Sequence, residues 1–166
     1  MKLFNGSNVV VQNPKILTPN RLLDFGEGFY TTSSYEQAYR WASRVKSRQK
    51  TGQQIINIYE FDRSGAEKNL KILDFDFPDS QWLNFVTVCR SGRNINLTYD
   101  IATGPVANDN VYATIQLYET GLLSEAETIT RIKVEKVFNQ VLFHTEQSLD
   151  YLSFIKYENI VDAVNG

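Results

Sequence analysis

FGEGFYTTSSYEQAY, residues 25–39, is the stretch that decides the fold. Two glycines precede the aromatic pair Phe29 and Tyr30, and glycines at such positions allow close approach of the backbone to another group. Ser33 and Ser34 then each begin a capping box, the pattern that starts a helix. Two interpretations follow from the residues alone. The segment is either a tight turn that leads into a core strand or a surface built to approach a flat ligand.

Outward from this stretch, helices and strands alternate irregularly along the chain. The apolar positions of the first helix recur every three or four residues and predict one buried face, made of Tyr35, Ala38, Tyr39, Ala42 and Val45. We expect strands at 2–4, 9–11, 55–61, 70–75, 99–103, 137–143 and 154–160, and further helices that begin near Asp79, Asn108 or Asp109, Ser124 and Gln147. This order, without a glycine-rich dinucleotide turn, predicts an α+β fold. Residues 1–166 are expected to form a single domain.

Composition excludes several classes of protein. The chain has 166 residues with a net charge of −2, so no overall basic field attracts nucleic acid. Its apolar runs are shorter than the roughly 20 residues that span a bilayer, and we expect a cytoplasmic protein with no membrane partner. The single cysteine, Cys89, and the single histidine, His144, leave no internal disulfide and no metal site. Cys89 lies on an apolar helix face and is expected to be a packed thiol, and His144 a structural residue.

The 25–39 stretch resembles the second NAD-binding motif of ADP-ribosyltransferases of the poly(ADP-ribose) polymerase branch. That motif has Gly-x-Gly-aromatic-Tyr followed by a helix with a second tyrosine, and Tyr39 is the residue that we match to it. Phe4-Asn5-Gly6-Ser7 stands where that branch has a strand ending in His-Gly-Ser or His-Gly-Thr. Asn139-Gln140-Val141-Leu142-Phe143 resembles the start of the third-motif strand.

Over nearly its whole length the chain also resembles a small bacterial family of unknown function that is grouped with ADP-ribosyltransferase-like proteins. The resemblance rests on Asp24–Thr32, Gly104–Tyr112 and Asn139–Glu146. Members are often encoded beside small partner proteins in apparent toxin–antitoxin pairs. The resemblance implies two small antiparallel sheets with flanking helices that form a cleft for NAD, the co-substrate. It also implies transfer of ADP-ribose to a macromolecular acceptor, protein or nucleic acid, by a toxin held by a small antitoxin.

The resemblance implies a role for each matched residue. The backbone of Gly6 holds the nicotinamide carboxamide, and Ser7 hydrogen-bonds the same group. Tyr30 stacks on the nicotinamide ring, and Tyr39 flanks it from the other face. Asn5 occupies the position of the histidine that holds the adenosine ribose. Gly28 is counted with the NAD-binding residues because it lets the backbone approach the ligand.

The implied catalytic residues depart from the family pattern. Gln140 stands where the third motif has a glutamate, and its amide brings no negative charge to an oxocarbenium-like ribose. Asn5 is either the natural residue or a deliberate replacement of histidine in a toxic protein. Asp109 either caps a helix or supplies the carboxylate that Gln140 lacks. Glu146 shares the face of Gln140 if the strand continues that far.

Two further questions stay open from the sequence. Arg40, Arg44 and Arg48 recur every four residues, and they form either a solvated helix face or a phosphate-binding stripe. An ADP-ribosyltransferase would be inactive as this variant if Asn5 has replaced its histidine, and two alternatives also stay open, the first of them because of the departures at Asn5 and Gln140. One is a non-catalytic NAD-binding or protein-interaction module, and the other is an NAD glycohydrolase.

Overall fold

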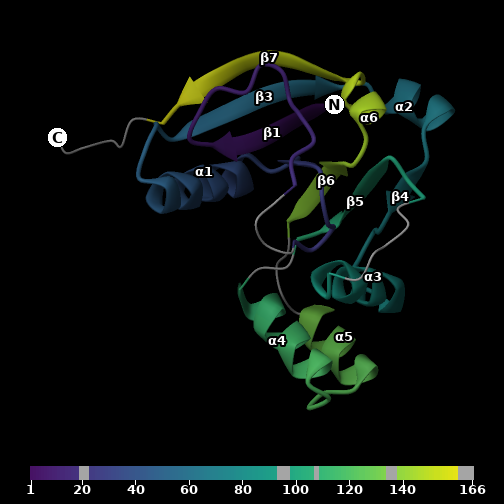
Figure 1. Cartoon of the computed structure of the whole chain (residues 1–166). Coiled ribbons are helices and arrows are strands. Elements are labelled where there is room, and N and C mark those ends of the chain that lie inside the picture. Colours follow the sequence, from purple (N-terminus) through teal and green to yellow (C-terminus); the bar gives the residue numbers. More distant parts are fainter. Residues whose placement is uncertain (19–22, 93–97, 107–108, 134–137, 161–166) are drawn as a thin grey trace.

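The structure is a computed structural model of the chain that describes residues 1–18, 23–92, 98–106, 109–133 and 138–160. Over these residues it has an α+β fold with seven strands and six helices (Figure 1). The strands are β1 (Lys2–Ser7), β2 (Phe29–Thr32), β3 (Ile55–Phe61), β4 (Ile72–Asp74), β5 (Ile101–Pro105), β6 (Asn139–Phe143) and β7 (Leu152–Asn159). The helices are α1 (Tyr35–Gln49), α2 (Arg63–Asn69), α3 (Ser80–Arg90), α4 (Asp109–Glu119), α5 (Glu125–Lys133) and α6 (Glu146–Leu149). None of these helices is long and apolar enough to cross a membrane.

The strands form one sheet, and the expectation of two small sheets is wrong in this respect. The order is β4-β5-β6-β2-β1-β3-β7, and only the β4–β5 pair is parallel. The two halves, β7-β3-β1 and β2-β6-β5-β4, meet between β1 and β2. Among the described residues that ladder has one register pair, Phe4 with Thr32, whereas β1 and β3 pair along the whole of β1. A single pair is enough to make the two halves one sheet.

Helices cover one face of this sheet in two groups. On the β1–β3 half, Phe4, Ile56 and Ile58 pack against Ala38 of α1. On the β5–β6 half, Ala102 and Leu142 belong to a larger core that includes Trp82, Val111 and Ile132 from α3, α4 and α5. Phe4 and Leu142 lie on the same face because paired residues share a face and side chains alternate along a strand. Both helix groups therefore flank β2.

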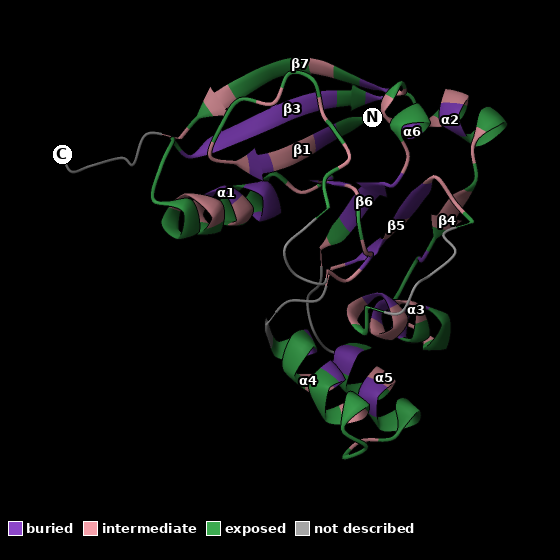
Figure 2. Ribbon diagram, viewed as in Figure 1, coloured by how far each residue is buried: buried purple, intermediate pink, exposed green. Residues whose placement is uncertain are grey.

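The opposite face is covered by chain segments rather than by long helices. Leu3, Tyr59, Phe61 and Phe143 form its core, and Val11 and Ile16 of the segment after β1 pack against them. Figure 2 shows β3 and β5 buried over most of their length, while the outer sides of α1 and α4 are exposed. The central strands are thus covered on both faces, whereas most of the edge strand β7 is exposed.

Local sequence signals set several helix starts as predicted. The Ser34 hydroxyl accepts a hydrogen bond from the Gln37 N–H at 3.2 Å and caps α1. Ser124 and Glu127 form a reciprocal capping box before α5, with bonds of 3.2 and 2.8 Å. Helix α1 ends at Gln49, three residues before Gly52.

The structure corrects other expectations. Residues 9–11 are not a strand, because Val11 donates to the side chain of Asn57 and packs on the sheet face. Tyr35 and Tyr39 are exposed by 39% and 42%, so the buried face of α1 is narrower than predicted. The strand at the C-terminal end begins at Leu152, two residues early, and the preceding helix stops at Leu149.

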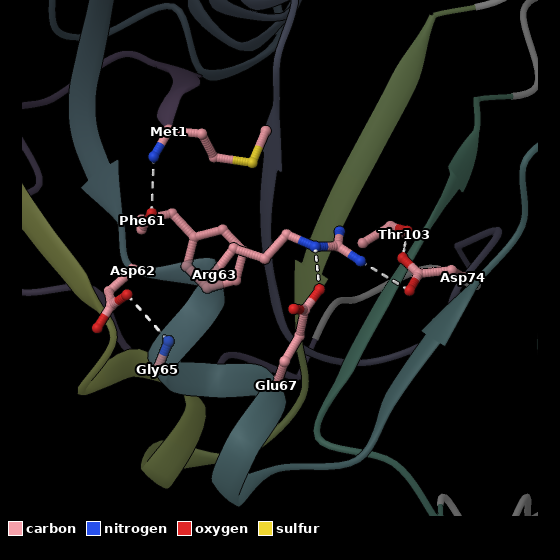
Figure 3. Close-up of polar contacts among 8 residues, drawn as sticks. All are labelled: Met1, Phe61, Asp62, Arg63, Gly65, Glu67, Asp74 and Thr103. Carbon is pink, nitrogen blue, oxygen red and sulfur yellow. Dashed lines mark hydrogen bonds and ion pairs between the residues drawn. The ribbon is translucent and has the colours of Figure 1, made fainter.

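Helix α2 was not anticipated from the sequence. Asp62 caps it by accepting a hydrogen bond from the Gly65 N–H at 3.0 Å. Arg63 then bridges Glu67 at 2.6 Å and Asp74 of β4 at 2.8 Å, as Figure 3 shows. These contacts connect the end of β3 to the far edge strand of the sheet.

Candidate functional site

The candidate site is the place where the two halves of the sheet separate. Beyond the pair of Phe4 and Thr32, the antiparallel register would set Gly6 opposite Tyr30, but no such pair is present among these described residues. We call this place the β1–β2 junction, defined by Asn5, Gly6, Tyr30, Thr32 and Gln140. It contains matched residues from all three motifs that the sequence singled out.

Gly6 is fixed by helix α1. A Cβ at this position would lie 2.0 Å from the Ala38 carbonyl oxygen and 2.6 Å from the Ala42 nitrogen. Only glycine therefore lets α1 approach β1 this closely.

The direction of the Gly6 peptide groups follows from the β1–β3 ladder. At the start of this ladder Met1 and Phe61 form a hydrogen-bonded pair, with both backbone bonds at 2.8 Å. In an antiparallel ladder every second pair is hydrogen-bonded, so counting from Met1 the odd-numbered residues of β1 bond to β3. Gly6 is even-numbered, and its N–H and C=O therefore point away from β3 and toward β2.

Asn5 bridges the junction with its side chain. Its Nδ2 donates to the Tyr30 carbonyl at 2.9 Å, and its Oδ1 accepts from Asn57 Nδ2 at 3.3 Å. The Tyr30 carbonyl is the group that the Gly6 N–H would meet if the ladder continued. The Asn5 amide thus takes the place of a backbone hydrogen bond across the junction.

Gln140 lies in the same row of the sheet as the last β1–β2 pair. It pairs with Thr32, which pairs with Phe4. Strands are spaced by roughly 4.8 Å, so the Cα atoms of Gln140 and Phe4 are on the order of 10 Å apart. The Gln140 residue is 2% exposed, and its Nε2 has no hydrogen-bond partner among the residues that the structure describes. A buried amide donor without a partner costs about 1–3 kcal/mol, and such a group calls for an explanation, for example strain, a catalytic role or a bound water.

Three matched residues have local structural partners. The Tyr30 hydroxyl donates to the Gly26 carbonyl at 2.6 Å, which ties its ring back to the preceding turn. The Ser7 hydroxyl accepts from the Val9 N–H at 3.3 Å. Gly28 has a φ of +152°, and a Cβ there would lie 2.3 Å from the Phe143 carbonyl. Gly28 is therefore required for the approach of β2 to β6, whatever else it does.

The aromatic residue of α1 beside Gly6 is Trp41 rather than Tyr39. The Trp41 Cβ lies 2.9 Å from where a Gly6 Cβ would be. Two residues correspond to about 200° around a helix, so Tyr39 and Trp41 occupy opposite flanks of α1. The Tyr39 flank lies on the β3 side, because Gln54, just before β3, donates to the Tyr39 carbonyl at 3.4 Å and to the Ser43 hydroxyl at 2.6 Å. The Trp41 flank therefore faces the β2–β6 half.

The motif has a tyrosine on this helix, so the sequence pointed to Tyr39 and not to Trp41, which lies two residues further along the chain. Tyr39 instead lines a hollow between α1 and the start of β3, and neither Asn5 nor Tyr30 lines that hollow.

Two carboxylates, those of Asp109 and Glu146, were expected as possible replacements for the negative charge that Gln140 lacks, and they lie in different places. Asp109 is the first residue of α4, but its side chain and Asn108 lie outside the described residues, so its role stays a prediction. Glu146 begins α6 and is exposed, because β6 ends at Phe143. The expectation that Glu146 shares the face of Gln140 on a continuing strand is therefore wrong.

Cys89 and His144 are both buried. Burial is the main cause that raises the pKa of Cys89 to about 12, with a smaller contribution from Asp24. The thiol is therefore unreactive at neutral pH, as expected of a packed cysteine. His144 Nδ1 lies 2.8 Å from the Glu27 carbonyl, and burial lowers the pKa of this imidazole.

We predict that the folded protein loses stability as the pH falls below about 6.5, the ordinary pKa of histidine. In the unfolded chain the imidazole takes up a proton there, whereas buried His144 does so only at lower pH. The contribution of neutral His144 to the free energy of unfolding is complete above pH 6.5, and it is lost as the pH falls through the pKa that His144 has in the folded protein. Urea unfolding at pH values between 7.5 and 5 measures this dependence, and the control His144→Gln, which has no imidazole, should lack it. An NMR titration midpoint of the single histidine at or above 6.5 would contradict the prediction.

The fold and the junction define an α+β protein with one mixed seven-stranded sheet. A family model described as "Protein of unknown function (DUF3990)" matches residues 1–154, and the chain belongs to this family. No curated protein and no solved structure matches it.

Proposed function

We propose that the protein is an NAD-dependent ADP-ribosyltransferase that binds the nicotinamide ribose of NAD at the β1–β2 junction. The order of the three sequence motifs supports this proposal, and so does their meeting at one place in the sheet. We further propose that it is the toxin of a toxin–antitoxin pair, modifies a macromolecule and is held by a small protein encoded beside it.

The observation that carries the proposal is the unpartnered amide of Gln140. Its Nε2 is buried on the sheet face flanked by α1 and by α3–α5, in line with Thr32 and Phe4. An amide donor in that position suits an oxygen acceptor such as a ribose hydroxyl. A bound ribose would remove the cost of leaving this donor unsatisfied.

The other junction residues would divide the work of binding. The Gly6 peptide offers one donor and one acceptor, the pair that a carboxamide needs. Trp41 would supply the aromatic face for the nicotinamide ring. Asn5 holds the Tyr30 carbonyl and so keeps β2 beside β1.

NAD supplies the reactive bond, between nicotinamide and the ribose carbon. As that bond breaks, its electron pair leaves with nicotinamide, and an oxygen or nitrogen of the acceptor bonds to the ribose carbon while losing its proton. The chain's part is to orient the ribose through Gln140 and to hold the carboxamide at Gly6. Gln140 brings no negative charge to the developing cation, so transfer by this chain is expected to be slow.

The same two amides favour a second candidate, a non-catalytic NAD-binding module. Asn5 and Gln140 do not titrate, and Asn5 is already engaged with Tyr30 and Asn57. An NAD glycohydrolase, with water as acceptor, is the third outcome. Incubation with NAD labelled in the adenylate and with cell lysate separates the three. Label on protein or nucleic acid shows transfer, free ADP-ribose shows hydrolysis, and unchanged but bound NAD shows a binding module.

We predict that Trp41→Ala weakens NAD binding by about 1–3 kcal/mol, the usual contribution of a ring stacked on a base. Tyr39→Ala removes an aromatic ring from the opposite flank of the same helix and should leave the NAD affinity within twofold. Calorimetry measures both variants, with circular dichroism to confirm that each is folded. The reverse result would restore Tyr39 as the stacking residue.

The antitoxin proposal has its own test. Co-expression with the protein encoded next to it, followed by size exclusion, should give a complex. Toxicity to the host in the absence of that partner should disappear in its presence. A chain that remains alone and has no effect on growth would count against this part of the proposal.

A further inference from the structure

A hollow of about 390 Å³ lies on the flank of α1 opposite to Trp41. It is bounded by the second half of α1 and by the turn that leads into β3. Its lining residues are Tyr39, Ser43, Lys46, Ser47, Lys50, Gly52 and Gln54. None of these seven residues is acidic.

The floor of the hollow is fixed by Gln54, which is 3% exposed. Its Nε2 donates to the Ser43 hydroxyl at 2.6 Å, and Ser43 donates to the Tyr39 carbonyl at 3.1 Å. Tyr39 itself is 42% exposed. An ordered polar floor therefore stands beside an accessible aromatic ring.

The hollow is basic although the protein is acidic overall. Lys46 and Lys50 are one helical turn apart, as are Ser43 and Ser47, and the chain carries a net charge of −2. Five of the 17 Lys and Arg residues fall within residues 40–50, namely Arg40, Arg44, Lys46, Arg48 and Lys50. Lysines near a helix C-terminus also stabilise the helix, but this role requires neither two serine hydroxyls nor an exposed ring beside them.

From this arrangement we infer that the hollow binds single-stranded nucleic acid. A backbone phosphate lies between Lys46 and Lys50, and a base stacks on Tyr39. Proteins that hold single strands combine lysine or arginine contacts to phosphate with aromatic rings for the bases. An acidic peptide would use the ammonium groups but would leave the ring without a planar partner.

The inference rests on the proposed function and names its acceptor class. Helix α1 separates the hollow from the β1–β2 junction, and Arg44 and Arg48 lie on the flank that carries Trp41. A strand held in the hollow follows this basic helix toward the junction. The ADP-ribose acceptor would then be a nucleic acid rather than a protein.

Fluorescence anisotropy with a labelled twelve-nucleotide single-stranded RNA, without NAD, tests the inference. The double variant Lys46→Gln/Lys50→Gln should bind at least about tenfold more weakly, and Tyr39→Ala should also lose affinity. Removing the contact to this one phosphate should reduce the slope of log K against log salt by about 0.7. The control Lys2→Gln/Lys68→Gln, with the same change of charge at exposed positions in β1 and α2, should stay within twofold.

Each other outcome overturns the inference. The first two are no RNA binding by the parent protein and an equal loss of RNA affinity in the control variant. The other two are competition by polyglutamate as strong as that by RNA and full displacement of the RNA by inorganic phosphate at an equal concentration. Calorimetry with NAD on the double variant separates this result from the proposed function. If the double variant loses RNA binding and keeps its NAD affinity, both the hollow and the proposed function are supported. If the parent protein binds RNA but not NAD, only the inference about the hollow is supported.

Discussion

Gln140→Glu is expected to raise NAD turnover by about 10²-fold. A carboxylate at this position adds the negative charge that stabilises an oxocarbenium-like ribose, and one well-placed electrostatic group contributes on the order of 10²–10³ in rate. The residue is 2% exposed, so an introduced carboxyl would ionise only at raised pH. The gain should therefore grow between pH 6 and 9. Release of labelled nicotinamide at each pH measures it.

The matched control is Gln140→Leu. It keeps the volume but removes the unpartnered amide, so the free energy of unfolding should stay the same or increase. NAD binding should weaken because the donor to the ribose is gone. A folded Gln140→Glu protein with unchanged turnover at every pH would show that this position does not face the reacting ribose.

Gly6→Ala is expected to destabilise the fold by at least about 3 kcal/mol. The new methyl group would lie 2.0 Å from the Ala38 carbonyl and 2.6 Å from the Ala42 nitrogen. Both atoms belong to the backbone of α1, so the whole helix must move, and overpacking of this kind costs 1–3 kcal/mol or more. Urea unfolding followed by circular dichroism measures the loss.

Gly121→Ala separates steric overlap from backbone strain. Gly121 has a φ of +78° with nothing within 4 Å of an added Cβ, so only the left-handed conformation opposes the change. The expected loss there is about 1–2 kcal/mol. A loss at Gly6 no larger than at Gly121 would mean that α1 can slide over β1, and that Gly6 is kept for a ligand rather than for packing.

Local signals predicted the parts of the fold that depend on neighbouring residues. The Ser34 cap, the Ser124 box and the strand of Gln140 each follow from residues within a few positions of one another. The joining of β1 to β2 did not follow, because it depends on Phe4 meeting Thr32 across 28 residues of chain. Even spacing along the strand says which face a residue takes, but not which strand will lie beside it.

The candidate site was predicted in part for the same reason. Motif matching found Gly6 and Gln140, since both lie in strands with recognisable neighbours. The motif specifies a tyrosine, which position 39 provides, whereas the side chain beside Gly6 belongs to position 41. The flank of a helix that faces a strand is set by packing, here of Ala38 and Ala42 against Gly6. Only the assembled structure shows that the Trp41 Cβ lies beside Gly6.

The single pair of Phe4 and Thr32 also makes the sheet mechanically uneven. Elsewhere each strand is held to its neighbour by at least three register pairs, so separation there would disrupt most of an interface. At β1 and β2 the ladder consists of one pair and the Asn5 amide bond, at about 0.5–1.5 kcal/mol for each hydrogen bond. The two halves are held together mainly by the core on the opposite face, where Phe29 packs on Tyr59 with ring centroids 5.8 Å apart and Phe143 packs on Phe61 at 5.2 Å. Side-chain packing rather than backbone pairing thus carries the middle of the sheet.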